Sequence, residues 1–238
     1  MELPDPTLVT NKLQAGYGRK HVVYDLDLRV APGEIVSIIG HNGAGKTTAL
    51  KTIFGMLPNM GGSVTFAGDD VSHTSPRDNV MRGMSFVLAE RFVFADLSVR
   101  DNLLLGAFHE NDAARREARR RRVFKLFPIL EERATQRAGT MSGGQQRMLS
   151  LGIALMTEAK LLMLDEPSLG LAPAAVIDIF GAIRTVADEE KLAVILVEQN
   201  VGQALRIADR FCVMRSGRII MEESAAQMRA RDNYWELF

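Results

Sequence analysis

The N-terminal third of the chain carries short apolar runs separated by glycine-rich and polar segments. Apolar and polar residues alternate in part over 7–15 and 20–30, on either side of Gly16-Tyr17-Gly18, which predicts a hairpin or two strands of a small antiparallel sheet. A continuous apolar stretch over 34–40 predicts a buried strand, followed by a helix to about residue 56. Further along, the pattern predicts a turn at Gly61-Gly62, a short strand over 63–66, a polar loop over 68–78 and a buried strand over 84–88.

The pattern changes near residue 90, where apolar positions begin to recur at helical spacing. Three helices are predicted, over about 99–109, 112–132 and 144–158. The remaining pattern predicts strands over 161–164 and 192–197, helices over 173–190 and 200–208, a hairpin of strands over 210–215 and 218–222, and a terminal helix over 224–237.

These elements predict an α/β fold built on a mostly parallel sheet. Strands that alternate with helices pair in parallel through right-handed crossovers, because only that connection packs the helix back onto a twisted sheet. The helical stretch over 90–159 interrupts this alternation as an inserted subdomain. We therefore predict a core made of 1–89 and 160–238, which includes the small antiparallel β subdomain, and a helical subdomain over 90–159.

Composition places the chain among ordinary globular proteins of a reducing compartment. Of its 238 residues, 47% are hydrophobic and 24% are charged, which allows a core without disulfides. The single cysteine, Cys212, lies in an apolar run and is expected to be a packed thiol.

The first six residues have neither the basic nor the apolar region of a signal peptide. No uncharged apolar stretch approaches the roughly 18 residues of a membrane span, so a role at a membrane would need another chain.

Charge gives no reason to expect a nucleic acid as a partner, since Lys plus Arg and Asp plus Glu both number 29. A basic run over 115–122 stands out within this balance. Its helical spacing with Val123, Leu126 and Phe127 favours a solvated helix face. The alternative is an interface with an acidic partner or with lipid headgroups.

The strongest chemical signal is a complete phosphate loop between a predicted strand and a predicted helix. Its sequence is Gly40-His41-Asn42-Gly43-Ala44-Gly45-Lys46-Thr47, which fits G-x-x-x-x-G-K-[ST]. Backbone N–H groups of such a loop can face a polyphosphate, and the helix N-terminus adds partial positive charge. Lys46 would reach the β- and γ-phosphates, and Thr47 would hold Mg²⁺. The loop therefore predicts a protein that binds a nucleoside triphosphate.

Two carboxylates follow the apolar run over 161–164. Asp165 can complete the coordination shell of Mg²⁺. Glu166, one residue closer to solvent, can polarise a water for in-line attack on the γ-phosphate. The alternative is an acidic loop or helix entry before Pro167, an interpretation that the phosphate loop upstream makes weaker.

A second candidate anion site precedes the helix predicted over 144–158. Ser142 and Gln145 can form a capping box around Gly143-Gly144. Two glycines in a first turn weaken a helix by up to about 1 kcal/mol each, so a cap alone does not account for them. Bare backbone at a helix N-terminus suits the close approach of a phosphate.

Together these motifs resemble the ABC ATPase family over nearly the whole chain and in the family's order. Residues 40–47 match its Walker A motif, 161–166 its Walker B motif, and 141–145 its signature, with Met141 in place of the usual leucine. Residues 168–171 match its D-loop. The resemblance implies ATP and Mg²⁺ as cofactors, with Glu166, Lys46 and Gln199 as catalytic residues and Thr47, Asp165 and Glu90 at the metal. It assigns nucleotide binding to Tyr17, Gly40, His41, Asn42, Gly43, Ala44, Gly45, Lys46, Thr47, Thr48, Glu90, Ser142, Gly143, Gly144 and Gln145.

Two positions depart from the family's commonest pattern. Glu90 stands where a glutamine is usual in the loop leading into the helical subdomain, and Gln199 stands where a switch histidine is usual. An amide can hydrogen-bond a γ-phosphate or a water but cannot carry a proton at neutral pH. Because Glu166 is present, we expect slower or retuned hydrolysis and not an inactive site.

Three segments, 137–144, 164–173 and 196–200, resemble the ATP-binding subunits of importers for branched-chain amino acids and related polar solutes, including urea. This resemblance implies a second ATP-binding chain, in a heterodimer or alternatively a homodimer, which clamps each nucleotide. It also implies two membrane permease subunits, contacted near residues 90–97, a solute-binding protein outside, and a peripheral location at the cytoplasmic face of the inner (plasma) membrane. An exporter, urea or lipid-transport cassette, or an ABC ATPase without a transport role, remain the alternatives.

Overall fold

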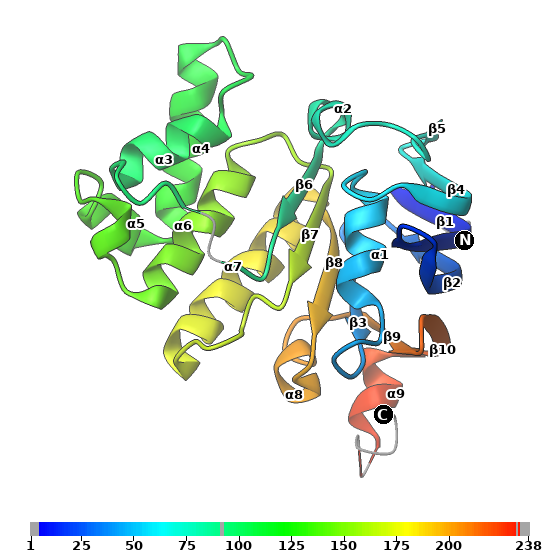
Figure 1. The fold of residues 1–238 in the computed structure, drawn as a ribbon. Helices are drawn as coiled ribbons and strands as arrows, with labels where there is room; N and C mark the ends of the chain where they lie inside the picture. Colours follow the sequence, from blue (N-terminus) through cyan, green and yellow to red (C-terminus); the bar gives the residue numbers. More distant parts are fainter. Residues whose placement is uncertain (1–4, 91–92, 232, 234–238) are drawn as a thin grey trace.

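The computed structural model describes residues 5–90, 93–231 and 233, which form two β-sheets with helices packed around them (Figure 1). The smaller sheet is antiparallel, with strand order β2-β1-β4-β5. Its strands are β1 (Leu8–Tyr17), β2 (Lys20–Val30), β4 (Asn59–Phe66) and β5 (Asp69–Asp70).

The larger sheet has the order β10-β9-β3-β8-β7-β6 and is parallel except for the pairing of β9 with β10. Its strands are β3 (Ile35–Ile39), β6 (Met84–Val87), β7 (Leu161–Asp165), β8 (Ala193–Glu198), β9 (Arg210–Arg215) and β10 (Arg218–Ser224). The two sheets confirm the predicted α/β fold with a mostly parallel sheet and a small antiparallel one.

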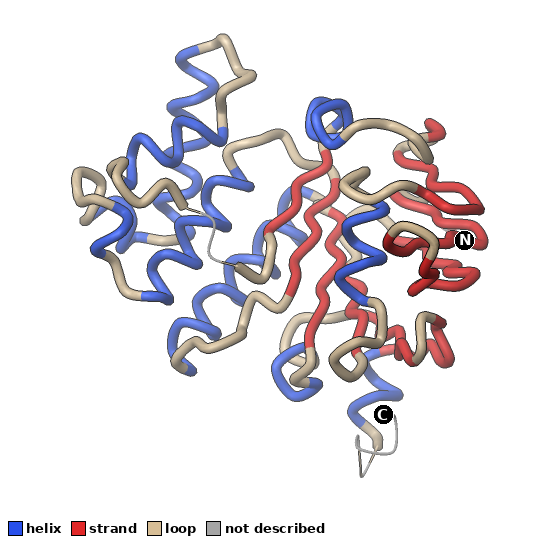
Figure 2. The backbone as a smooth tube through the Cα atoms, viewed as in Figure 1, coloured by secondary structure: helices blue, strands red, loops and turns tan. Residues whose placement is uncertain are grey.

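Helices cover both faces of the larger sheet, and several gather beyond its β6 edge (Figure 2). The helices are α1 (Lys46–Ile53), α2 (Pro76–Arg82), α3 (Val99–Gly106), α4 (Ala113–Leu126), α5 (Pro128–Glu132), the 3-10 turn Ala138–Thr140, α6 (Gly143–Leu155), α7 (Pro173–Glu190), α8 (Val201–Ala204) and α9 (Ala225–Arg229). Helices α3 to α6 occupy the region predicted as an inserted helical subdomain, whose boundaries at 90 and 159 stay a prediction. None of the helices in the described ranges is both long enough and apolar enough to cross a membrane.

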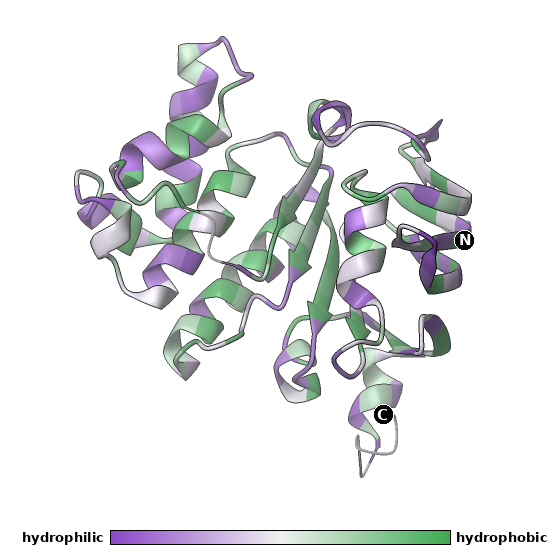
Figure 3. Cartoon of the chain, in the orientation of Figure 1, coloured by the Kyte–Doolittle hydropathy of each residue, from purple (hydrophilic) through white to green (hydrophobic). Residues whose placement is uncertain are grey.

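The larger sheet separates two apolar cores. In β3, Ile35 and Ile39 belong to one core, whereas Val36 and Ile38 belong to the other, because successive side chains of a strand point to opposite faces. Helix α1 packs into the second core with strands of the smaller sheet, and α3, α6 and α7 pack into the first. The strands between them are hydrophobic along their length (Figure 3), as strands buried on both faces must be.

Gly61-Gly62 does not form the predicted turn but lies inside β4. Gly61 pairs with Gln14, next to a shift in register between β1 and β4. Gly62 has φ 78°, and a Cβ there would lie 2.3 Å from the carbonyl oxygen of Lys12. The two glycines therefore allow a β-bulge and a close approach between strands.

Other differences concern the ends of helices. The segment predicted as a polar loop contains the start of α2, where Ser75 accepts a hydrogen bond from the backbone of Asp78. The helix predicted over 112–132 is divided, because Phe127 leaves helical geometry at φ −133° and Pro128 begins α5. Helices α8 and α9 are shorter than predicted, and residues 232 and 234–237 of the predicted terminal helix lie outside the described residues.

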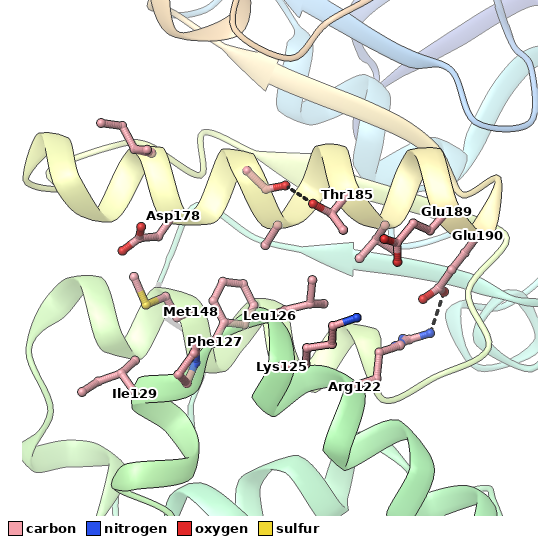
Figure 4. A pocket seen from close by; sticks show the side chains of 15 residues that line it. Arg122, Lys125, Leu126, Phe127, Ile129, Met148, Asp178, Thr185, Glu189 and Glu190 are labelled. Atoms are coloured by element: carbon pink, nitrogen blue, oxygen red, sulfur yellow. Dashed lines mark hydrogen bonds and ion pairs between the residues drawn. The ribbon is translucent and has the colours of Figure 1, made fainter.

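A cleft of about 680 Å³ lies between α7 on one side and α4 and α5 on the other (Figure 4). Phe127 and Met148 contribute apolar lining to it. At one end, Arg122 of α4 forms an ion pair with Glu190 of α7 at 2.6 Å. Arg119 likewise pairs within the chain, so part of the basic run is neutralised internally.

Candidate functional site

The phosphate loop connects β3 to α1 and lies close against β9. A Cβ at Gly40 would lie 2.2 Å from the carbonyl oxygen of Met214, so only glycine fits there. Gly45 has φ 107°, and a Cβ there would lie 3.0 Å from Cε of Met214. The glycines at both ends of the loop are thus required by backbone conformation and close packing.

Helix α1 presents an open N-terminus to the loop. Within the described ranges, no side chain caps this end, and the first turn carries no acidic residue. The first N–H groups of a helix have no partner inside the helix, and they lie at the positive end of the helix dipole. This end of α1 is therefore suited to bind an anion.

Lys46 is buried beneath the loop, with only 5% of its surface exposed. Its Nζ donates hydrogen bonds to the carbonyl oxygens of Gly40 at 2.7 Å and His41 at 3.1 Å. Burial lowers the pKa of Lys46, and the nearby carboxylates, Glu166 first, oppose that shift. The ammonium is thus held in place by the loop, with much of its hydration already removed.

Thr47 and Asp165 meet although they are far apart in sequence. The Thr47 hydroxyl donates to the carboxylate oxygens of Asp165 at 2.8 and 3.1 Å. Burial raises the pKa of Asp165, against the hydrogen bond from Thr47. A hydroxyl and a carboxylate supply the hard oxygen ligands that Mg²⁺ prefers. The described residues contain no group of three or more His, Cys, Asp or Glu that could hold a metal ion.

Glu166 and Gln199 also lie together, at the ends of two neighbouring strands. Strands β7 and β8 are neighbours, with Asp165 paired to Val197, so the residues that follow both strands share one edge of the sheet. Gln199 Nε2 donates to Glu166 Oε1 at 2.5 Å. Glu166 has φ 47°, an uncommon left-handed value for a residue with a side chain, and such strain is often found at functional sites.

Glu198 is a buried residue of this edge that the sequence did not single out. Only 2% of its surface is exposed, and burial raises the pKa of its carboxyl group. Its Oε1 accepts a hydrogen bond from the backbone N–H of Ser168 at 3.1 Å. Glu198 therefore anchors the start of the segment 168–171. The signal was a carboxylate directly after the apolar run over 192–197.

The Ser142–Gln145 segment forms the N-terminus of α6 and contains the predicted capping box. Ser142 Oγ accepts from Gln145 N at 3.3 Å, and Gln145 Oε1 accepts from Ser142 N at 3.0 Å. At Gly144, a Cβ would lie 2.9 Å from Cβ of Ala175 in α7, so close helix packing explains this glycine. Helix α6 packs on the opposite face of the larger sheet from α1. The structure thus does not join this segment to the phosphate loop of the same chain.

Tyr17 and Glu90 lie at the surface. Tyr17 ends β1 with 51% of its surface exposed. Glu90 is exposed in the loop after β6, three residues beyond Val87, which pairs with Leu164. This register places Glu90 beyond the same edge of the sheet as Asp165. Of the predicted contact region 90–97, residues 91 and 92 lie outside the described residues.

Comparisons with known proteins agree with this geometry. A sequence profile of the family described as ABC transporter matches residues 23–169. The chain is 43% identical over 229 residues to BraG, a high-affinity branched-chain amino acid transport ATP-binding protein of Pseudomonas aeruginosa, covering 94% of this chain and 97% of BraG. It is 33% identical over 216 residues to the lipopolysaccharide export system ATP-binding protein LptB of Escherichia coli K12, covering 90% and 89%.

A solved structure, that of an ATP-binding subunit of an ABC transporter, matches with a TM-score of 0.84 and 25% identity over 97% of this chain and 99% of that chain. The profile covers more than half of the sequence, and both relatives match over almost their full length. The chain therefore belongs to the ABC transporter family, as an ATP-binding subunit with ATPase activity.

Proposed function

We propose that this chain binds ATP together with Mg²⁺ and hydrolyses it to energise the import of branched-chain amino acids or a related small polar solute. The observation that carries the ATPase part of this proposal is the contact between Thr47 and Asp165. It joins the phosphate loop to the acidic edge of the sheet, where Glu166 and Gln199 also lie.

The positions and chemistry of the site residues support a role for each of them. Lys46 and the open end of α1 would bind the β- and γ-phosphates, and Tyr17 would stack on the adenine. Thr47 and Asp165 would hold Mg²⁺, with Glu90 as a further proposed group at the metal, and the ion would neutralise phosphate charge when bound. Glu166 would accept a proton from the attacking water, and the Gln199 amide would orient that carboxylate.

A second cassette would complete each nucleotide site. The Ser142–Gln145 segment is exposed or half-buried at the end of α6, on the other face of the sheet from α1. This segment is suited to bind a phosphate, but it does not meet the phosphate loop of its own chain. It could meet the phosphate loop of a second chain, which supports a head-to-tail pair. We propose a heterodimer with another ATP-binding chain, with a homodimer as the alternative.

The transported solute is proposed from the relatives. BraG, by its name, serves high-affinity transport of branched-chain amino acids, and its 43% identity over nearly the whole chain favours that solute class. LptB, by its name, serves lipopolysaccharide export, so an export cassette is the second candidate. Two permease subunits would span the inner membrane, and this chain would bind them at its cytoplasmic face. A solute-binding protein would deliver the solute from outside.

Reconstitution tests the solute directly. The chain would be assembled in vesicles with candidate permease subunits, a second cassette and a solute-binding protein, and ATP hydrolysis would be measured with each solute added outside. We expect leucine, isoleucine or valine to stimulate hydrolysis and to accumulate inside. Absence of stimulation by any amino acid or by urea would remove the importer assignment, and extraction of a lipid would favour export.

Gln199 offers a separate prediction about the rate. In Gln199→His, an imidazole with an ordinary pKa of about 6.5 replaces an amide that cannot carry a proton. We expect turnover to change severalfold and to gain a dependence on pH between about 6 and 7.5 that the parent lacks. Initial rates at saturating MgATP from pH 5.5 to 8.5 measure this. Identical profiles for the two proteins would show that proton transfer at residue 199 does not limit the rate.

A further inference from the structure

The turn between β9 and β10 is covered by other parts of the molecule. Arg215 pairs with Arg218, so the connection between the two strands has only two residues. These are Ser216 and Gly217, with φ values of 48° and 79°, both in the left-handed region that tight hairpin turns use. Connecting segments normally lie at the surface, but Gly217 is buried. The segments that pack against it therefore need to be identified.

One of these segments is the phosphate loop. The backbone N–H of Gly217 donates to the carbonyl oxygen of Ala44 at 2.8 Å. The strand before the turn also contacts the loop, since the carbonyl oxygen of Met214 excludes a side chain at Gly40 and its Cε packs close to Gly45. The hairpin of β9 and β10 thus supports the phosphate loop near both of its ends.

The other segment is β2, which lies next to β10 (Figure 1). The backbone N–H of Tyr24 donates to the carbonyl oxygen of Gly217 at 2.8 Å. A Cβ at Gly217 would lie 2.1 Å from the carbonyl oxygen of Val22 and 2.8 Å from Cδ2 of Tyr24. The guanidinium of Arg218 lies 5.4 Å from the centre of the Tyr24 ring and forms an ion pair with Asp25 at 2.9 Å. The turn is therefore packed against β2 without space for another atom.

Strand β2 forms a hairpin with β1, the strand that ends in Tyr17. Within this hairpin Val23 pairs with Ala15, and Lys20 pairs with Tyr17. The part of β2 that the turn contacts thus lies only a few residues from the position opposite Tyr17. The turn is placed between the two parts of the proposed nucleotide site, the loop for the phosphates and the hairpin that carries the adenine-stacking ring.

We propose that the Ser216–Gly217 turn is a positioning element that sets the separation between the Tyr17 ring and the phosphate loop. ATP binds through its base and its phosphates at once, so its affinity depends on whether the two contact sites lie at the distance that the ribose spans. A free triphosphate chain uses the phosphate loop alone and does not depend on this distance. The inference rests on the proposed nucleotide site, to which it adds a segment that acts through its neighbours.

The test adds one methyl group to the intact chain, in Gly217→Ala. The three atoms nearest to the new Cβ all belong to β2, so the substitution displaces that strand and not the phosphate loop. Isothermal titration calorimetry should show MgATP affinity lower by about 5- to 50-fold, within the range that loss of stacking on an aromatic ring costs. Inorganic tripolyphosphate with Mg²⁺ should bind within about threefold of the parent, because the helix end and loop that hold it are unchanged.

Gly68→Ala is a matched control for backbone strain. Gly68 has φ 89°, and no described atom lies within 4 Å of a Cβ built there. An alanine at this exposed position adopts the same unfavourable conformation without displacing a neighbour. It should lower thermal stability and leave the affinities for MgATP and tripolyphosphate at their parental values.

Arg218→Met is a milder change at the same turn. Its side chain is 55% exposed, so the fold should tolerate the substitution, which removes the contacts with the Tyr24 ring and Asp25. We expect MgATP affinity to fall by about two- to fivefold, the scale of an exposed cation–π contact, with tripolyphosphate binding unchanged. This variant decides the proposal if Gly217→Ala does not fold.

A double-mutant cycle with Tyr17→Ala separates positioning from general damage. In that background Gly217→Ala should cost little further MgATP affinity, because the ring that the turn positions is already absent. Additive losses, equal losses for ATP and tripolyphosphate, or parental MgATP affinity in Gly217→Ala overturn the positioning role. If Tyr17→Ala alone binds MgATP like the parent, the proposed adenine contact is wrong and the inference is lost with it.

Discussion

Replacing Glu166 with glutamine is expected to lower ATP turnover by about 10²- to 10³-fold while ATP remains tightly bound. The substitution keeps the size of the side chain and its ability to hydrogen-bond. It removes the negative charge and the capacity to accept a proton from water. Steady-state phosphate release measures turnover, and equilibrium binding of a fluorescent ATP analogue measures affinity in the same preparation.

The structure explains why affinity should survive this change. Lys46, Thr47 and the open end of α1 lie on the phosphate loop and are untouched by it. Glu166 also contributes a negative charge close to the Lys46 ammonium, so its removal frees that ammonium to interact with phosphate. We therefore expect ATP affinity to be unchanged or higher. Such a variant should accumulate ATP-bound pairs of chains, visible as a larger species in size-exclusion chromatography with MgATP.

A matched control is available on α7. Glu189 is exposed, lies by the cleft away from the phosphate loop and undergoes the same chemical change in Glu189→Gln. Its turnover should match that of the parent. If Glu166→Gln keeps more than about a third of parental turnover, general-base catalysis by Glu166 is excluded, and another group must activate the water.

The sequence predicted the core of the fold because its strands are buried on both faces. Short continuous apolar runs such as the one over 34–40 are typical of strands buried on both faces, and they correspond to β3, β7 and β8. Helix α7 matches its predicted range because its apolar face is long and regular. The polar helix α2 was missed for the opposite reason, since few of its residues are buried and it has little apolar periodicity. Its Ser75-Pro76 start was the available signal.

In the candidate site, the sequence predicted the groups that lie in contiguous motifs but not the contacts between distant segments. The phosphate loop is one contiguous segment whose chemistry is visible in its own sequence, and the strand ends explain why Asp165 and Glu166 come close to it. Glu198 contacts a backbone group, the N–H of Ser168. Backbone partners leave no trace in the sequence, so such residues become visible only when the fold brings them together.

Replacing Lys46 with alanine is expected to have the largest effect on nucleotide binding. Lys46 has only 5% of its surface exposed, and its ammonium interacts electrostatically with the carboxylates of Glu166, Asp165 and Glu198. Without it, a triphosphate would enter a site where three acidic groups have lost their nearest cation. We expect MgATP affinity to fall by at least about 10²-fold, which corresponds to about 2.7 kcal/mol, and turnover to become undetectable.

Isothermal titration calorimetry with MgATP measures this loss, and thermal unfolding with and without MgATP provides a second readout. The parent should unfold at a higher temperature with MgATP, because a ligand that binds only the folded state stabilises it by RT ln(1 + [L]/Kd). Lys46→Ala should show no such increase at the same concentration. Lys125→Ala, which removes an exposed lysine on α4 by the cleft, should keep the full increase. If Lys46→Ala binds MgATP with parental heat and affinity, the buried ammonium is a structural group of the loop and the phosphates bind elsewhere.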